Sequence, residues 1–295
     1  IGYNALTSYT GVGHAQADGA TVVGYKAMEN SVFDIYSCAF GYLAAQNVNQ
    51  AHYTHVFGYE VGQEISTGGG NHLFGFRAGK YITTGGGNCG FGSQALRGSA
   101  SAKATGNYNT AFGEVALQNI ETAYHNSALG RNALNALTTG RDNTGVGMSA
   151  AYACTTGNYN SILGSHVAGA ISSGSYNVAI GALSAHITTG SNNIIMGYQV
   201  AENIHTGSNN IALGFQSNRR VRSDNNITIG YRAGLGGSGA NTNTTNINAK
   251  NVIIGYEAGY NVTTGVQNVA IGNSAMKGGS AITGQGNAGI GNNTM

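Results

Sequence analysis

The sequence has no proline and no tryptophan, and it is poor in charge. Asp, Glu, Lys and Arg make up 8% of its 295 residues, against about 25% in ordinary soluble domains. Nucleic-acid binding requires clustered Lys and Arg to neutralise phosphates, so this composition argues against a nucleic-acid partner. With only 11 Asp and Glu, the sequence also disfavours an enzyme that needs several carboxylates.

Long apolar runs and a cysteine framework are missing as well. No stretch approaches about 18 consecutive apolar residues, so neither a transmembrane helix nor membrane insertion is predicted. The three cysteines, Cys38, Cys89 and Cys154, lie in no CxxC motif and cannot all pair within one chain. We interpret them as buried small apolar residues. Because the sequence begins at Ile1 without Met and ends inside a patterned stretch, we expect a fragment of a longer fibre.

What the sequence has in abundance is glycine, at 49 positions, and many of these glycines recur at a fixed spacing. Each recurring glycine follows an apolar residue, as in the phrases VAIG at 178–181 and 269–272, and we call it an anchor glycine. Ten of the seventeen intervals between successive anchors are 17 residues and two are 16. The anchors are Gly2, Gly13, Gly24, Gly41, Gly58, Gly75, Gly92, Gly113, Gly130, Gly147, Gly164, Gly181, Gly197, Gly214, Gly230, Gly255, Gly272 and Gly291. This spacing indicates a repeat protein in which each interval is one structural unit.

Further positions recur in each interval. Ala or Val lies three residues after the anchor in fourteen copies, and Asn lies four residues before it in thirteen consecutive copies, from Asn71 to Asn287. A turn such as Thr-Thr-Gly at 188–190 precedes the Asn. Glycine and Asn tolerate left-handed corners. Each interval therefore predicts a turn, a short apolar strand, a glycine break and a second short strand that carries the small residue. Glycine within every candidate window excludes a helix.

The sequence thus predicts an all-β fold, a parallel β-roll or β-solenoid with about 17 residues per coil. Residues 1–295 are expected to form one repeat domain, with irregular short repeats in 1–40 and inserted loops near 97–105 and 234–250. Equivalent residues are expected to stack, which gives an aliphatic column before the anchor and an Asn column at the turn. Because Ala-sized interior residues enclose little apolar volume, we expect chains to share a core as a homotrimer, intertwined or side by side.

The phrase NVAIGALSAHITTGSNN at 177–193, repeated in part from Asn268 onward, is similar to the repeats of two related families. It resembles the repeat region of phage tail fibres and the β-roll heads of trimeric autotransporter adhesins. The resemblance covers nearly the whole chain, and the 17-residue spacing with its Thr-Thr-Gly turn is closer to the phage type. It implies a trimeric parallel β-roll that displays receptor-binding surfaces.

On this basis the sequence predicts a structural and adhesive segment of a trimeric phage tail fibre on the virion, which binds a host-surface glycan or lipopolysaccharide. The alternative is the head of a bacterial trimeric adhesin at the bacterial cell surface, and a third interpretation is an ice-binding solenoid with Thr columns. No GxSxG, HExxH or P-loop motif is present, and Glu60 and Glu64 do not stack at a repeat spacing. No catalysis and no organic cofactor are therefore expected.

Two histidines give the only metal hypothesis. His55 and His72 lie three residues before successive anchors and are expected to stack about 4.8 Å apart. In a trimer, two rings of three imidazoles around the threefold axis could bind an octahedral transition metal such as iron or nickel. The alternative is that both side chains face solvent or hydrogen-bond to neighbouring Thr and Tyr.

Receptor contacts are expected where the repeat is interrupted. The densest charge on the chain, formed by Arg219, Arg220 and Arg222, is a candidate for binding acidic glycans or phosphorylated lipopolysaccharide. The alternative for these arginines is an ordinary coil corner, or ion pairing between chains with Asp224 or Glu202.

The longest interval and an aromatic column give the remaining candidates. A polar insertion at 236–250 is expected to protrude, and its candidate contacts are Asn241, Asn243, Asn246 and Lys250. A Tyr follows the anchor in seven copies, namely Tyr3, Tyr25, Tyr42, Tyr59, Tyr198, Tyr231 and Tyr256. We interpret this column as packing between chains, and stacking on a glycan is the alternative.

Overall fold

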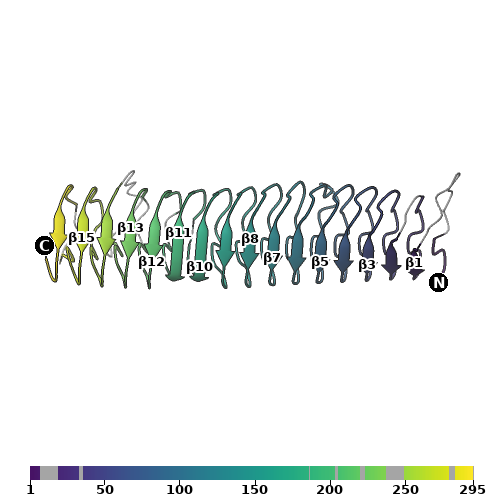
Figure 1. Ribbon diagram of the computed structural model, residues 1–295, viewed down its shortest axis with the longest axis horizontal. Coiled ribbons are helices and arrows are strands. Elements are labelled where there is room, and N and C mark those ends of the chain that lie inside the picture. Colours follow the sequence, from purple (N-terminus) through teal and green to yellow (C-terminus); the bar gives the residue numbers. More distant parts are fainter. Residues whose placement is uncertain are drawn as a thin grey trace. The chain divides into compact units, whose positions relative to one another are not determined.

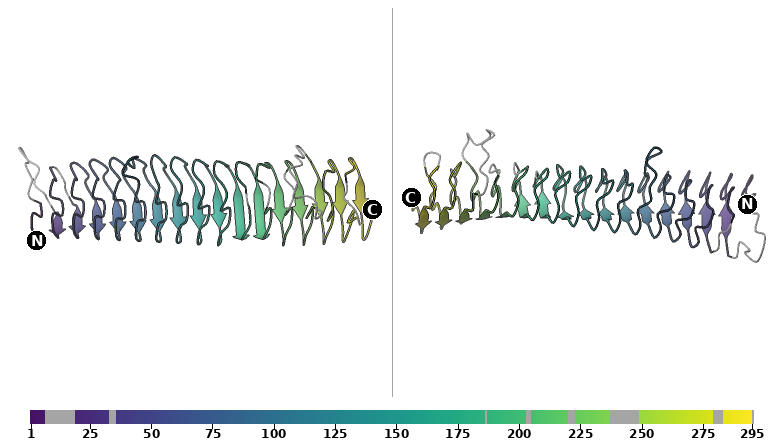
Figure 2. Two further views of the ribbon diagram at one scale, coloured as in Figure 1. Left: turned by 180° about the vertical axis from the view of Figure 1, so that it is seen from behind. Right: turned by 90° about the horizontal axis from the view of Figure 1, so that it is seen from above.

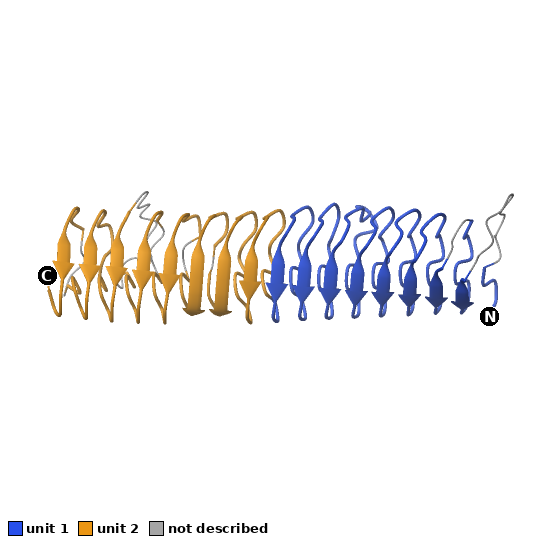
Figure 3. Ribbon diagram, in the orientation of Figure 1, with its two compact units in different colours: residues 1–149 blue, residues 150–295 orange. Residues whose placement is uncertain are grey.

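The computed structural model of the protein describes residues 1–6, 19–32, 36–185, 187–202, 205–219, 223–236, 249–278 and 283–294. Within these ranges the chain forms short strands and turns and no helix, which confirms the all-β prediction. The chain divides into two compact units, Ile1–Ser149 and Ala150–Met295, and both are built from the same coil (Figure 3).

In each unit the strands pair in parallel and in chain order (Figure 1). The register pairs residues one repeat apart, such as His55 with His72 and Val178 with Ile194. The first unit contains β1 (Thr21–Val23), β2 (Cys38–Phe40), β3 (His55–Phe57), β4 (His72–Phe74), β5 (Cys89–Phe91), β6 (Thr110–Phe112), β7 (Ser127–Leu129) and β8 (Thr144–Val146). The second contains β9 (Ser161–Leu163), β10 (Val178–Ala182), β11 (Ile194–Tyr198), β12 (Ile211–Leu213), β13 (Ile227–Ile229), β14 (Val252–Ile254), β15 (Val269–Ile271) and β16 (Ala288–Ile290). The predicted parallel β-solenoid is confirmed.

Every strand after β1 buries its second residue. In β3, Val56 is fully buried, whereas His55 and Phe57 on either side of it are half-buried. Successive residues of a strand point to opposite faces, so the residues one and three before each anchor form an outward face, which we call the outer face. The column predicted immediately before the anchor therefore exists, but it lies on the outer face and not in the core.

The interior of the coil is filled by side chains of one chain. Beside the small residue three after the anchor, the coil also buries larger aliphatic residues, as with Ala116, Leu117 and Ile120, which are all 0–1% exposed. The premise that Ala-sized residues leave the core too small is therefore wrong, because Leu and Ile from the same coil fill it. The trimer itself stays a prediction.

The second strand predicted after the anchor does not form in the part of the chain that the structure describes. The second and fourth residues after the anchor are left-handed instead, with φ of 53° at Val115 and 48° at Leu117. A left-handed residue cannot continue an extended strand, so this segment is a compact series of turns. Its backbone still bonds to the neighbouring coil, since the N–H of Leu117 donates to the carbonyl of Ala133 at 3.0 Å.

The anchor glycines let successive coils approach closely. Each described anchor has φ between 121° and 142°, a region that L side chains rarely adopt. A Cβ added to Gly92 would lie 2.5 Å from the carbonyl oxygen of Gly113 in the next coil. The coils can therefore pack at this spacing only if each anchor position is glycine.

The first coil differs from the predicted short repeats. The N–H of Gly24 donates to the carbonyl of Ile1 at 2.8 Å, and the N–H of Lys26 donates to that of Tyr3 at 2.9 Å. Gly2 and Gly24 are thus neighbours in the stack. Residues 7–18, which include the predicted anchor Gly13, lie outside the described residues.

A column of buried Asn side chains joins the coils, as predicted. Asn126 Nδ2 donates to Asn109 Oδ1 at 3.0 Å and to the carbonyl of Gly140 at 2.9 Å. Its own Oδ1 accepts from the backbone N–H and from Nδ2 of Asn143, at 2.9 and 3.0 Å. The same pattern runs through the second unit. Each buried amide thereby satisfies both its donors and its acceptor.

The inserted loop near 97–105 occurs as predicted and rises above the neighbouring coil corners (Figure 2). Ala104 returns to the stack through a parallel bridge to Ile82. Lys103 Nζ lies 3.6 Å from the Glu64 carboxylate and 4.8 Å from the ring centroid of Tyr81. The loop is therefore held against the two preceding coils. The second predicted loop, near 234–250, is described only at 234–236 and 249–250.

Candidate functional site

The residue five before each anchor forms a column along the coil corners, which we call the corner column. All of its members are left-handed, with φ between 49° and 76°. In the first unit these are Gly19, Tyr36, Tyr53, Gly70, Gly87, Tyr108, His125 and Asp142, and in the second Tyr159, Tyr176, Asn192, Asn209, Asn225, Lys250, Gln267 and Gly286. Glycine and Asn adopt this conformation readily, whereas a Tyr does so at a cost of about 1–2 kcal/mol. The exposed Tyr rings are therefore kept at a position where the backbone favours other residues.

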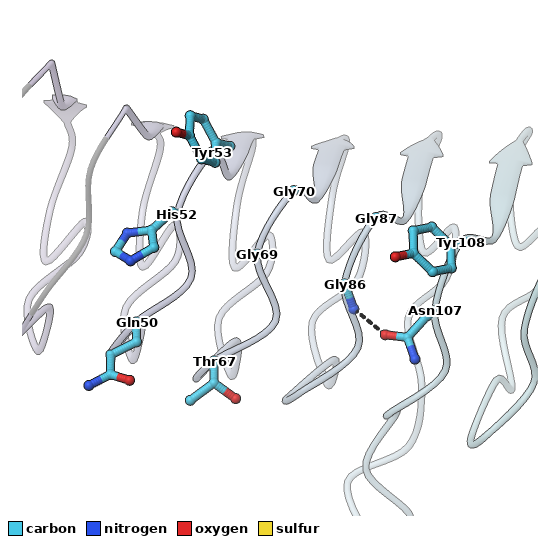
Figure 4. Close-up of a pocket in the computed structure, with 10 residues that line it drawn as sticks. All are labelled: Gln50, His52, Tyr53, Thr67, Gly69, Gly70, Gly86, Gly87, Asn107 and Tyr108. Carbon is cyan, nitrogen blue, oxygen red and sulfur yellow. Dashed lines mark hydrogen bonds between the residues drawn. The ribbon is translucent and has the colours of Figure 1, made fainter.

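Two neighbouring coils of the first unit lack side chains at the corner. Gly70 and Gly87 occupy the corner column, and Gly69 and Gly86 precede them. Because these four glycines have no side chains, an open cavity of about 510 Å³ forms at the corner, which we call the notch (Figure 4). This volume lies within the range of about 300–1,000 Å³ typical of ligand sites. The notch is lined by Gln50, His52, Tyr53, Thr67, Gly69, Gly70, Gly86, Gly87, Asn107 and Tyr108.

Aromatic rings border the notch at both ends. On one side the Tyr53 ring stacks on Tyr36 with centroids 5.6 Å apart, and no side chain covers it from the Gly70 coil. On the other side the Tyr108 ring lies over Gly87, where an added Cβ would approach Tyr108 Cδ1 to 2.6 Å. The two exposed rings belong to coils that flank the two glycine corners (Figure 4).

The floor of the notch presents an uncapped backbone donor. In the next coil the N–H six before the anchor donates to a side chain, since Gly86 N–H donates to Asn107 Oδ1 at 2.7 Å. Ser175 N–H and Ser191 N–H do the same with the next serine hydroxyl. Gly69 faces Gly86, which has no side chain, and its N–H has no acceptor among the described residues.

The predicted histidine pair forms on the outer face. His55 and His72 stack with ring centroids 4.8 Å apart, and their Nδ1 atoms are 3.0 Å apart. Cys38 and Cys89 flank them in register. No group of three or more His, Cys, Asp or Glu able to hold a metal occurs in the described ranges. One chain thus supplies two imidazoles that bond to each other, and the axial metal stays a prediction that needs further chains.

The stacked histidines predict a pH dependence. Partial burial, and then the neighbouring His55, lower the pKa of His72 below its ordinary 6.5. Because the folded state favours neutral His72, its contribution to stability is complete above pH 6.5 and declines as the pH falls. We expect the His72 ring signals in NMR to titrate with a midpoint below 6.5. His55→Ser should raise that midpoint only in part, since burial is the main cause. A midpoint at or above 6.5 in the native protein would contradict this.

Of the receptor candidates in the second unit, the structure describes Arg219 and Lys250. Arg219 Nε donates to Glu202 Oε2 one coil away, so the ion pair predicted between chains forms within one chain. Lys250 lies on the corner column with an exposed side chain. Arg220, Arg222, Asn241, Asn243 and Asn246 lie outside the described residues.

The cysteine interpretation is right for one residue of three. Cys154 is fully buried, and burial raises the pKa of its thiol to about 11. Cys38 and Cys89 are half-buried on the outer face, so their assignment to the core is wrong, because the strand register turns them outward. All three are free.

The Tyr column after the anchors forms with exposed rings. Successive rings stack 5.0–5.9 Å apart, from Tyr3 to Phe76 in the first unit and from Tyr198 to Tyr256 in the second. In one chain these rings are open to solvent. Packing between chains stays a prediction.

Interruptions in repeat length do not mark the notch, because the intervals that end at Gly75 and Gly92 are both 17 residues. The available signal was the phrase Thr-Gly-Gly-Gly-Asn, which occurs in two successive coils at 67–71 and 84–88. It replaces both corner residues with glycine without changing the spacing.

These features define the chain as a parallel β-solenoid repeat protein with an aromatic-bordered notch in its first unit. No protein-family model, no curated protein and no solved structure matches it. Across the described ranges, no helix has the length and hydropathy needed to span a bilayer.

Proposed function

We propose that the chain is a structural and adhesive segment of a trimeric phage tail fibre that presents host-receptor-binding surfaces. The alternative is that the chain is the head of a bacterial trimeric adhesin, which the same observations support. The observation that carries the proposal is the apolar outer face of the sheet, since it gives identical chains a surface on which to associate.

The outer face leaves apolar side chains exposed in a single chain. In the first unit the rings of Phe40, Phe57, Phe74, Phe91 and Phe112 stack 4.4–4.8 Å apart along it. In the second unit Leu163, Ile194 and Met196 are 40–47% exposed. Contiguous apolar surface marks an interaction site. Because the same residue types recur at the strand spacing, other copies of the chain present a matching surface, and closed symmetry favours a homo-oligomer.

A binding role is favoured over catalysis by the environment of the carboxylates. Glu60 accepts from Arg77 Nε at 2.8 Å and from Lys80 Nζ at 2.5 Å. Glu64 is 3.6 Å from Lys103 Nζ. The two carboxylates that are nearest in sequence are thus held in ion pairs, whereas glycoside hydrolysis needs one carboxyl kept protonated and the other free.

Association through the outer face predicts a thiol-labelling pattern. In the native trimer, a maleimide probe should leave Cys38 and Cys89 unmodified because other chains cover them. Cys154 should stay unmodified in any folded state, because burial raises the pKa of its thiol to about 11 and little reactive thiolate forms. Light scattering should give three times the 30.0 kDa chain mass.

A charge on the outer face provides the control. Met196→Lys should yield a folded monomer, since Met196 is exposed, whereas Thr67→Lys at the exposed coil corner should leave the trimer intact. A wild-type monomer whose Cys38 and Cys89 react rapidly would contradict trimerisation through this face. The adhesive role is tested separately, by binding of labelled protein to a panel of bacterial cells before and after periodate oxidation of their surface glycans.

A further inference from the structure

We infer that the notch binds an uncharged oligosaccharide, held between Tyr53 and Tyr108 with its hydroxyl groups on the glycine floor. The inference rests on the adhesive role proposed above and is independent of the trimer. It assigns the ligand to the first unit and to a surface other than the outer face.

The two Tyr rings supply the apolar contact. The apolar C–H face of a sugar ring packs on an aromatic face, and Tyr offers such a face together with a polar tip. Tyr53 and Tyr108 are 55% and 65% exposed, and both hold left-handed backbones with φ of 59° and 56°. Gly70 and Gly87 lie between them in the corner column and carry no side chains, so the space between the two rings stays open.

The floor supplies hydrogen bonds that a hydroxyl group can complete. Gly69 N–H lacks the side-chain acceptor that caps the equivalent donor at Gly86. Asn107, whose side chain is exposed, uses its Oδ1 for Gly86, and its Nδ2 points away from Gly86 (Figure 4). Thr67 adds an exposed hydroxyl. A sugar hydroxyl both donates and accepts, so it matches this mixture of groups.

The electrostatics of the notch select against charged ligands. None of its ten lining residues is Asp, Glu, Lys or Arg. An acidic glycan or a phosphate would leave its charge without a partner there, whereas a neutral sugar has no charge to pair and its hydroxyl groups can hydrogen-bond to the floor. The arginines of the second unit, predicted to bind acidic glycans, are not part of this site.

The aromatic column continues past the notch. Tyr36 stacks on Tyr53 at 5.6 Å, and His125 lies 5.5 Å from Tyr108. A glycan longer than the notch therefore gains contacts on either side, so affinity should increase with chain length.

One substitution closes the notch without disturbing the coil. Asn occupies the corner column at Asn192, Asn209 and Asn225 with φ of 59–60°. An added Cβ at Gly70 would lie 3.7 Å from its nearest neighbour, which is an ordinary contact. Gly70→Asn should thus fold normally. The matched control is Gly286→Asn, at the same column position with nothing within 4 Å of the added Cβ.

The experiment uses isothermal titration of the full chain with defined hexasaccharides. The neutral probes are maltohexaose, cellohexaose, mannohexaose and chitohexaose, and hexagalacturonate is the acidic comparison. At least one neutral probe is expected to bind at millimolar concentration or below. Gly70→Asn and Tyr108→Asn should each weaken that binding by at least about tenfold. Gly286→Asn and Tyr176→Asn should bind like the native chain.

Three outcomes would overturn the inference: no neutral probe binds, Gly70→Asn binds as well as the native chain, or hexagalacturonate is preferred. If the chain adheres to cells and Gly70→Asn adheres equally, the adhesive role stands and the notch is not its site. If native protein binds a neutral probe at the notch but no cell, the site stands and the adhesive role fails.

Discussion

Replacement of Gly92 by alanine is expected to lower the free energy of unfolding by about 3 kcal/mol or more. The φ of Gly92 is 136°, and an added Cβ would lie 2.5 Å from the carbonyl oxygen and 2.6 Å from the carbonyl carbon of Gly113. That carbonyl belongs to backbone whose N–H already donates to Phe91 at 2.8 Å, so it cannot move aside without breaking the stack. Backbone strain and overpacking each cost about 1–3 kcal/mol.

Gly286→Ala separates the two causes. Gly286 has φ of 70° but no atom within 4 Å of an added Cβ, so this variant carries only the left-handed strain, about 1–2 kcal/mol. Urea denaturation gives the comparison, and amide exchange at Gly113 reports on the affected coil, since solenoids can open repeat by repeat. Equal losses for the two variants would show that contact between coils at the anchor has no part in stability.

Asn126→Ala is expected to cost about 3–5 kcal/mol. Asn126 is fully buried and its side chain serves both neighbouring coils. The change removes the acceptor used by the N–H and Nδ2 of Asn143 and the donor used by the carbonyl of Gly140. Each buried group left without a partner costs about 1–3 kcal/mol, and alanine also leaves a cavity.

The control for this variant is Asn49→Ala, whose side chain is exposed. It should change the free energy of unfolding by no more than about 0.5 kcal/mol, as surface substitutions usually do. Chemical denaturation of both variants, followed by circular dichroism, provides the measurement. A loss below about 1 kcal/mol for Asn126→Ala would mean that water replaces the amide in the column.

The strand of each coil could be predicted because three signals coincide there. The apolar phrase, the following glycine and the preceding Asn all mark the same segment, and the observed register confirms the spacing, as with His55 and His72. The prediction of a second strand was wrong because its left-handed positions carry residues such as Val115 and Leu117. These residue types have no intrinsic preference for a left-handed backbone. Stacking on neighbouring coils overrides their local propensity.

The fourth position after the anchor did hold a usable signal. Gly62, Gly79, Gly234 and Gly259 occupy it, all with φ between 54° and 57°. Glycine in four coils at one position indicates a left-handed site in every coil of a regular stack. The outward direction of Cys38 could not be foreseen, since the sequence alone does not say which face of so short a strand is buried.

The candidate site was predicted least well, for a physical reason. Charge and loop length drew attention to Arg219, yet that side chain is paired with Glu202. The notch depends on side chains that are missing from two adjacent corners, and it becomes visible only once Gly70 and Gly87 are known to stack between Tyr53 and Tyr108. A binding site that forms where side chains are missing has no sequence motif that would identify it.

The register of the strands also bears on how the chain reaches its fold. Hydrogen bonds run to the coil before or the coil after, a separation of 17 residues in most pairs. Relative to 295 residues this gives a contact order of about 0.06, as low as that of helical bundles and far below the usual value for all-β proteins. Each unit can therefore grow coil by coil during synthesis, each new coil forming on the edge left by the one before it.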